Sequence, residues 1–96
     1  MSKTKYQIRP SSKFKRDLKK CKKSGLDLDE LQSVIDTLAN GISLPDKYHD
    51  HALKGTYSDC RECHINPDWL LIYKIDNGEL ILTLVETGSH SYLFKM

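Results

Sequence analysis

The sequence lacks the features that define several familiar classes of protein. No apolar stretch approaches the roughly 18 residues that a helix needs to cross a bilayer, and no apolar segment follows the basic N-terminus as it would in a secretion signal. The three cysteines are an odd number and fit a reducing compartment better than a disulfide framework. Glycine-rich nucleotide motifs, a serine-based nucleophile motif and the HExxH zinc motif are also missing. We therefore expect a cytoplasmic protein that acts away from the membrane.

What is present describes one small domain, residues 1–96, with an uneven distribution of charge. The chain is 39% hydrophobic and 29% charged, which is the composition of an ordinary globular protein. The net charge is only +2, but residues 1–25 hold ten lysines and arginines against Asp17 alone, which gives +9. The rest of the chain holds five basic and twelve acidic residues, which gives −7. A dense basic segment of this kind is typical of polyanion binding, although an ordinary solvated helix face has the same composition.

The N-terminal part of the chain predicts a strand followed by a basic helix. Residues 6–9 alternate as a strand does. A helix then begins at Ser11 or Ser12, runs to about Ser24 and ends at Gly25. Its apolar stripe is narrow, and basic side chains cover the remaining surface. We predict that this surface binds RNA through Lys13, Lys15, Arg16, Lys19, Lys20, Lys22 and Lys23.

A second helix has a strong start signal. Asp27 can cap it, and Glu30 stands three residues later as the reciprocal partner of a capping box. Apolar residues recur at helical spacing from Leu31 to Leu38, and Asn40-Gly41 ends the helix. Two short helices joined at Gly25 are expected to form an antiparallel pair that covers one face of a sheet.

The C-terminal half predicts strands. The stretch Arg61–Tyr73 alternates, bends at Asn66-Pro67-Asp68 and continues as an apolar run, because a proline cannot sit in the middle of a sheet. The predicted fold is an α+β domain of order β-α-α-β-β-β, with two N-terminal helices packed on an antiparallel-rich four-stranded sheet. A short C-terminal turn or helix follows.

The Asn77-Gly78 pair predicts the register of the last hairpin. This dipeptide is typical of a two-residue type I′ turn. Such a turn pairs Ile75 with Leu80 and, counted outward, pairs Trp69 with Glu86. Glu86 is then expected beside the bend at residues 66–68.

Cys60-Arg61-Glu62-Cys63-His64 matches the C-x-x-C-H pattern of haem attachment, but the pattern does not fit here. Haem attachment of this kind implies export. In a strand, side chains three residues apart point to opposite faces, so Cys60 and Cys63 cannot share a haem, a zinc ion or an intrachain disulfide. We expect Cys63 to point inward. A zinc site that uses His49 or His51 stays open as an alternative.

Histidines and carboxylates are the other candidates for chemistry. Imidazole and carboxylate groups exchange protons near neutral pH, which suits acid–base cleavage of RNA without a metal or a cofactor. A base takes the proton of the ribose 2′-OH, an acid protonates the leaving 5′-oxygen, and donors or cations stabilise the charge on the phosphorane. The groups expected at one sheet corner are His51, His64, His90, Asp68, Glu86 and the ring of Trp69.

Three linked motifs resemble a known family. They are D-H-A-L-K-G at 50–55, R-E-C-H-I-N-P-D-W-L-L-I-Y at 61–73 and T-G-S-H-S-Y-L-F at 87–94. Together they are similar to the YafQ branch of the RelE-like bacterial toxins. The resemblance implies a ribosome-dependent, metal-independent mRNA interferase that cuts A-site mRNA at A-rich codons. It also implies a cognate antitoxin, usually a ribbon-helix-helix protein like DinJ or RelB. The toxin is expected to contact operator DNA only through this antitoxin.

The resemblance also assigns roles to single residues. It implies that the histidines and the aspartate transfer protons and that the aromatic residues position the mRNA. Docking of the basic helix on ribosomal RNA is a separate prediction, which rests on the +9 charge of residues 1–25. The proton-transfer positions fall on His51, His64, Asp68 and His90, and the aromatic positions fall on Trp69 and Phe94.

Glu86 departs from the family pattern, which usually has arginine before T-G-[ST]-H. The arginine should stabilise the pentavalent phosphate, whereas a carboxylate would repel it. Either the chain is a natural divergent member in which another cation, such as Arg61 or Lys54, takes the role, or Glu86 is a deliberate change that inactivates a lethal toxin. A second function class therefore stays open, namely a non-catalytic toxin fold that binds its antitoxin and modulates repression of the operon.

Overall fold

The computed structural model describes residues 4–89 and folds them into a sheet with two α-helices and two short 3-10 helices. The predicted sites His90 and Phe94, and the predicted C-terminal turn, lie outside the described residues. In chain order the elements are β1 (Gln7–Pro10), α1 (Ser12–Lys23), α2 (Leu28–Ala39), the 3-10 helix η1 (Asp46–Tyr48), β2 (His51–Ala52), the 3-10 helix η2 (Gly55–Tyr57), β3 (Arg61–Asn66), β4 (Trp69–Asp76) and β5 (Ile81–Ser89).

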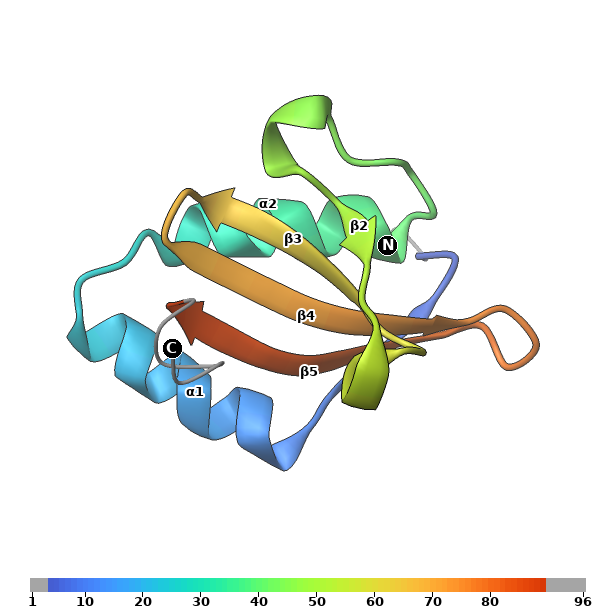
Figure 1. Cartoon of the computed structure of the whole chain (residues 1–96), viewed down its shortest axis with the longest axis horizontal. Helices are drawn as coiled ribbons and strands as arrows, with labels where there is room; N and C mark the ends of the chain where they lie inside the picture. Colours follow the sequence, from blue (N-terminus) through green and yellow to red (C-terminus); the bar gives the residue numbers. More distant parts are fainter. Residues whose placement is uncertain (1–3, 90–96) are drawn as a thin grey trace.

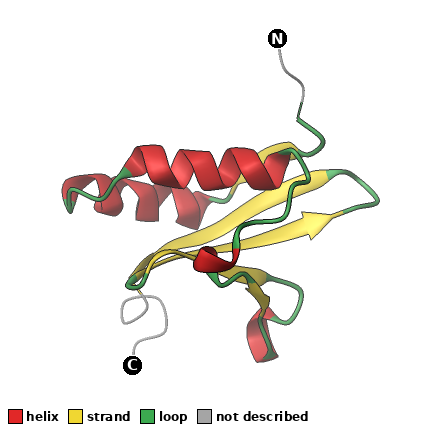
Figure 2. Ribbon diagram, turned by 90° about the horizontal axis from the view of Figure 1, so that it is seen from above, coloured by secondary structure: helices red, strands yellow, loops and turns green. Residues whose placement is uncertain are grey.

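The strands form one sheet in the order β1-β5-β4-β3-β2 (Figure 1). β1 pairs with β5 in parallel, and every other pair is antiparallel. Figure 2 shows α1 and α2 side by side on one face, while the segment from η1 to η2 lies on the other, which we call the open face. The predicted α+β class is confirmed. The sheet has five strands rather than four because His51–Ala52 pairs with β3.

Both α-helices begin where the sequence predicts. The Ser11 hydroxyl accepts a main-chain N–H of the first turn of α1. Asp27 caps α2 by accepting the N–H groups of Asp29 and Glu30. Gly25, between the helices, has a φ of 76°, which a glycine adopts without strain. Neither α-helix of the described residues is long and apolar enough to span a membrane.

The core lies between the two helices and the sheet. The apolar stripe of each helix packs against alternate side chains of β3, β4 and β5, as the periodicities predict. Trp69 and Tyr73 are its largest fully buried side chains. The other buried members are Tyr6, Phe14, Cys21, Leu31, Val34, Ile35, Leu38, Ala39, Cys63, Ile65, Leu71, Leu82 and Leu84.

The turn between β4 and β5 is wider than the sequence predicts. A four-residue loop, Asn77–Leu80, takes the place of the two-residue turn. The Asp76 carboxylate accepts two main-chain N–H groups of this loop, and Leu80 adopts the left-handed conformation with a φ of 56°. A side chain that caps the turn in this way competes with the type I′ geometry. The predicted pairing of Ile75 with Leu80 is therefore wrong, and Ile75 pairs with Leu82.

A bulge in β5 changes the direction in which Glu86 points. Val85 is an extra residue between two pairs of the β4–β5 ladder. Because side chains alternate along a strand, one extra residue reverses the faces of the residues that follow. Glu86 pairs with Ile72 on the open face, and Trp69 pairs with Ser89. The predicted pairing of Trp69 with Glu86 is wrong.

Candidate active site

Alternation along β3 sends two polar side chains to the open face. Cys63 and Ile65 belong to the core beneath the helices, so Glu62 and His64 point the opposite way. Cys63 is fully buried, and burial raises the pKa of its thiol to about 12. The predicted inward orientation of Cys63 is confirmed, and a buried, protonated thiol is a poor nucleophile.

Three ionisable side chains meet on the open face. Glu62 Oε1 lies 3.3 Å from His51 Nε2 and 3.4 Å from His64 Nε2. The Glu62 side chain is 5% exposed, whereas those of His51 and His64 are 49% and 25% exposed. Two imidazoles and a carboxylate thus lie within reach of one another on an accessible face. Groups of these types serve as bases and acids in proton transfer.

The backbone fixes the tautomer of His51. Its Nδ1 lies 2.7 Å from the carbonyl oxygen of His49. A carbonyl oxygen only accepts, so Nδ1 carries a proton, and in the neutral ring Nε2 keeps the lone pair. The left-handed conformation of His49, with a φ of 48°, ends η1 just before β2. The Nε2 lone pair of the neutral ring thus faces Glu62 and solvent, and Nε2 can donate to the Glu62 carboxylate only after it has taken up a proton.

Glu86 is buried on the same face and is bound from two sides. Its Oε1 accepts the hydroxyl of Tyr57 at 2.8 Å, and its Oε2 lies 4.0 Å from Lys13 Nζ. The hydrogen bond to this carboxylate, together with burial, raises the pKa of Tyr57 to about 12. Glu86 therefore joins three segments, namely β5, η2 and α1.

Trp69 is not part of the open face. Its side chain is 2% exposed in the core, and its Nε1 donates to the Thr87 hydroxyl at 2.9 Å. His64 pairs with Leu70, so Trp69 points to the opposite face from His64. A ring in this position has no surface for stacking on a base. The bend at residues 66–68 therefore does not bring the side chains of His64 and Trp69 together, contrary to the prediction.

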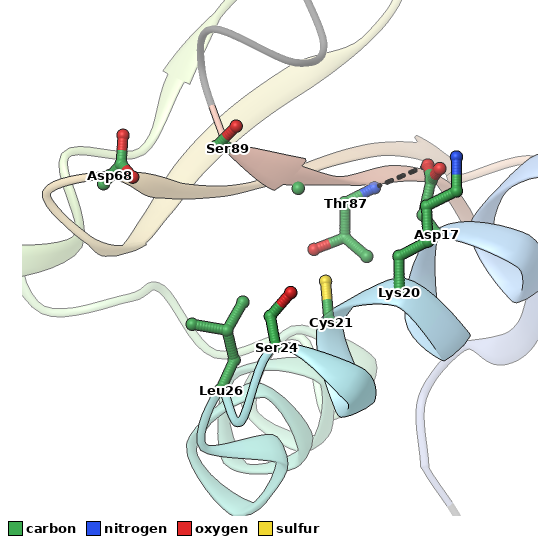
Figure 3. A pocket seen from close by; sticks show the side chains of 9 residues that line it. Asp17, Lys20, Cys21, Ser24, Leu26, Asp68, Thr87 and Ser89 are labelled. Atoms are coloured by element: carbon green, nitrogen blue, oxygen red, sulfur yellow. Dashed lines mark hydrogen bonds between the residues drawn. The ribbon is translucent and has the colours of Figure 1, made fainter.

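Three other predicted residues also lie apart from the His51–Glu62–His64 cluster. Asp68 is exposed at the turn between β3 and β4, where it borders a hollow of about 370 Å³ beneath α1 (Figure 3). Arg61 Nε donates to the carboxylate of Asp50, which also accepts the hydroxyl of the core residue Tyr73. Lys54 is exposed just before η2.

The basic side chains of α1 cover its outer surface, as predicted. Asp17 faces the protein and is 2% exposed, and the neighbouring Phe14 and Cys21 are buried as well. The Lys13 side chain is 43% exposed. The remaining basic residues of the predicted RNA-binding surface are exposed, namely Lys15, Arg16, Lys19, Lys20, Lys22 and Lys23.

Comparison with known proteins identifies the family. A family model described as "Bacterial toxin of type II toxin-antitoxin system, YafQ" matches residues 6–95. The chain belongs to the YafQ toxin family. It is 35% identical to the "mRNA interferase toxin YafQ" of Escherichia coli strain K12 over 88 residues, which cover 91% of this chain and 94% of that protein.

Solved structures of other members have the same fold. A metal-bound toxin from Helicobacter pylori is 49% identical to this YafQ-family chain, with a TM-score of 0.87, and the match covers 93% of this chain and 99% of that one. YafQ in the E. coli DinJ-YafQ toxin-antitoxin complex is 34% identical, with a TM-score of 0.86, and the match covers 94% and 98%. The resemblance drawn from the three motifs is confirmed.

Sequence reasoning missed Glu62 and Tyr57 of this YafQ-family site, and it assigned Lys13 to RNA binding without its contact to Glu86. Glu62 carried a usable signal, because it stands two residues before His64 in a strand and must share its face. The contacts of Tyr57 and Lys13 with Glu86 had no signal in the sequence, because η2 and α1 bring these residues to Glu86 from distant parts of the chain.

Proposed function

We propose that this chain is an mRNA interferase toxin that cuts mRNA in the ribosomal A site, as a metal-independent endoribonuclease. The observation that carries the proposal is the His51–Glu62–His64 cluster, which supplies paired proton-transfer groups on an accessible face. Membership of the YafQ family and the name of the E. coli relative support the same activity.

The geometry suggests a role for each member of the cluster. His51 Nε2 accepts the proton of the ribose 2′-OH, since its Nδ1 proton is held by a carbonyl. The 2′-oxygen attacks the adjacent phosphate, and the bond to the 5′-oxygen breaks. Protonated His64, stabilised by the Glu62 carboxylate, donates the proton to that oxygen. Asp68 and His90 are proposed as further proton-transfer groups, and Phe94 as a contact to the mRNA.

Docking on the ribosome and binding of the antitoxin are proposed as two further interactions of the protein. The exposed basic side chains of α1 suit contacts with ribosomal RNA phosphates. An antitoxin of the ribbon-helix-helix type holds the toxin inactive and alone contacts operator DNA. The complex of a related YafQ with DinJ supports an antitoxin partner.

The test is primer-extension mapping of mRNA cuts in a translating extract. Wild type is expected to cut, and His51→Gln, His64→Gln and Glu62→Gln are each expected to lose at least about 100-fold in rate. Lys74→Gln is the control, because Lys74 pairs with the exposed Asp59 away from the cluster. Cutting by His64→Gln at the wild-type rate would contradict the mechanism. A wild-type protein that binds antitoxin but never cuts would favour the non-catalytic binding module.

One observation supports a second function for the same cluster, namely binding of a transition metal. The ligand atoms of His51, Glu62 and His64 all lie within 4.8 Å of one another, and a related H. pylori toxin is described as metal-bound. Two imidazoles and a carboxylate suit Zn²⁺ or Cu²⁺. Calorimetric titration with Zn²⁺ tests this, and bound metal should slow cleavage because it occupies the proton-accepting nitrogen. Undiminished cleavage with one equivalent bound would contradict this competition.

A further inference from the structure

Lys13 carries the basic charge of α1 to the edge of the open face. Its Nζ lies 3.1 and 3.0 Å from the two carboxylate oxygens of Asp17 and 4.0 Å from Glu86 Oε2. The side chains of Asp17 and Glu86 are 2% and 9% exposed, whereas that of Lys13 is 43% exposed. Two buried carboxylates therefore hold one ammonium group that remains accessible to solvent.

The outer edge of β5 explains why α1 lies at this place. The pairing of β1 with β5 ends at Pro10, and beyond it two main-chain groups of β5 bind side chains of Ser11, the N-cap of α1, and of Asp17 in α1. The Ser11 hydroxyl donates to the Val85 carbonyl at 2.7 Å. Asp17 accepts the N–H of Thr87 at 3.3 Å, the bond drawn in Figure 3. These contacts lie on either side of Glu86, so α1 cannot shift without displacing this residue.

The cluster and Lys13 approach the centre of the open face from opposite sides. Glu62 and Glu86 both pair with Ile72, so they lie two strand spacings apart, or about 10 Å. His51 and His64 lie on the Glu62 side, and Lys13 lies on the Glu86 side. Lys13 contacts Glu86 from the α1 side, so a phosphate bound above Ile72 would have the proton-transfer groups on one side and the Glu86–Lys13 pair on the other.

We propose that Lys13 supplies the positive charge that stabilises the pentavalent phosphate, and that Asp17 and Glu86 position its ammonium group. The proposal rests on the proposed RNA cleavage. In that reaction, attack of the 2′-oxygen adds negative charge to the phosphate oxygens, and a fixed cation there lowers the barrier. Glu86 on its own would raise the barrier, and its contact with Lys13 turns it into an anchor for the cation.

The other candidate cations are less suitably placed. Arg61 is held by Asp50 beside the core residue Tyr73, on the side of β3 that His64 does not face. Lys74 pairs with Asp59 further along β4, beyond Ile72. The Lys13 ammonium group contacts two oxygens of Asp17 and one of Glu86, so a phosphate oxygen would share or replace one of these contacts, and the 4.0 Å contact with Glu86 is the longest of them.

The test compares single-turnover cleavage on programmed ribosomes for matched variants. Lys13→Gln alone leaves Asp17 and Glu86 without a counter-charge and can weaken folding. Lys13→Gln/Glu86→Gln removes one charge of each sign and keeps an oxygen for Tyr57 to bind. We expect this double variant to cleave about 100-fold more slowly than Glu86→Gln, with little change in KM. Lys13→Arg should stay within about tenfold of wild type.

Lys74→Gln is the matched control, because the Lys74 side chain is 45% exposed and also forms an ion pair. It should cleave at the wild-type rate. If Lys13 serves only as a counter-ion of Glu86, the double variant and Glu86→Gln will cleave equally fast. That result would overturn the proposal and leave the proposed function standing.

A second readout does not depend on cleavage. A nucleoside vanadate has the trigonal-bipyramidal shape and charge of the phosphorane and can be titrated against the isolated protein. The double variant should bind it at least about tenfold more weakly than Glu86→Gln. If wild type binds it in a Lys13-dependent way but does not cut mRNA, the proposed function fails and the assignment of Lys13 stands. Absent binding, or binding that is independent of Lys13, would overturn the assignment.

Discussion

Removing the Tyr57 hydroxyl should destabilise the fold measurably, because this group satisfies a buried carboxylate. Tyr57 donates to Glu86 Oε1 at 2.8 Å, and Glu86 is 7% exposed. Hydrogen bonds to charged groups contribute about 1.5–3 kcal/mol, and the partial exposure of Tyr57 places this one near the lower end. Tyr57→Phe should therefore lose about 1.5–2 kcal/mol, or roughly 6–16 °C in Tm for a domain of this size.

The effect should depend on pH in a direction that the pKa of Tyr57 sets. In the folded protein this pKa is raised to about 12, chiefly by the hydrogen bond to Glu86, whereas in the unfolded chain it is about 10. The contribution to stability is therefore fully present below pH 10 and is lost as the pH rises through 12. Urea unfolding of both proteins at several values between pH 7 and pH 11 measures the difference.

A control and a direct titration complete this test. In Glu86→Gln the amide oxygen still accepts the hydroxyl, but the charge is gone, so the ultraviolet titration of Tyr57 should move back toward about pH 10. The difference between wild type and Tyr57→Phe isolates this tyrosine from the others. If Tyr57→Phe is as stable as wild type at pH 7, the contact between η2 and β5 does not exist in solution. A constant difference up to pH 11 would contradict the role of the phenolic proton.

Three further predictions address other parts of the molecule. Trp69→Phe should lose about 1–3 kcal/mol of stability, because a buried hydrogen bond and core volume are removed. It should leave the affinity for RNA unchanged in a filter-binding assay, and a loss of affinity without a loss of stability would contradict the core position of Trp69. Cys63 should resist iodoacetamide at pH 8 while the protein is folded, because burial raises its thiol pKa to about 12, and rapid labelling seen by mass spectrometry would count against this burial. Binding to ribosomes, measured by co-sedimentation, should weaken steeply as the salt concentration rises from ~50 to ~300 mM. Binding that does not change with salt, or a salt dependence that stays the same when four lysines of α1 are replaced by Gln, would exclude docking through this helix. The four replaced residues are Lys19, Lys20, Lys22 and Lys23.

The pairing of β4 with β5 shows where sequence reasoning failed. Asn77-Gly78 correctly marked a turn, but the Asp76 carboxylate stabilises a wider loop. The bulge at Val85 then added one more residue of displacement. The cap by Asp76 is a short-range feature that the interpretation overlooked, whereas the bulge has no signal in the local pattern. At the bulge, the hydroxyl of Ser11, the N-cap of α1, binds the Val85 carbonyl, and two residues later Asp17 of α1 binds the N–H of Thr87.

The candidate site was predicted in part. His51 and His64 were identified as residues of one site, and the structure brings them into contact with Glu62. Trp69 was assigned to the same surface because it is near in sequence, but strand alternation places its ring in the core. Glu86 was expected to oppose Trp69, and it binds Tyr57 on the other face.

The sequence by itself determined the local structure of this protein. The caps Ser11 and Asp27, the helix break at Gly25 and the alternation of β3 are short-range features, because each depends on residues only a few positions apart. Membership of the family likewise followed from three linear motifs.

Only the tertiary structure decided which charges meet. Lys13 and Tyr57 reach Glu86 from a helix and a loop that are far from it in sequence, and a single bulge sets the face on which they meet. The physical reason is the period of two in a strand: one inserted residue reverses every later side chain. The register of a hairpin therefore sets which groups share a site, and distant contacts of the folded chain fix that register.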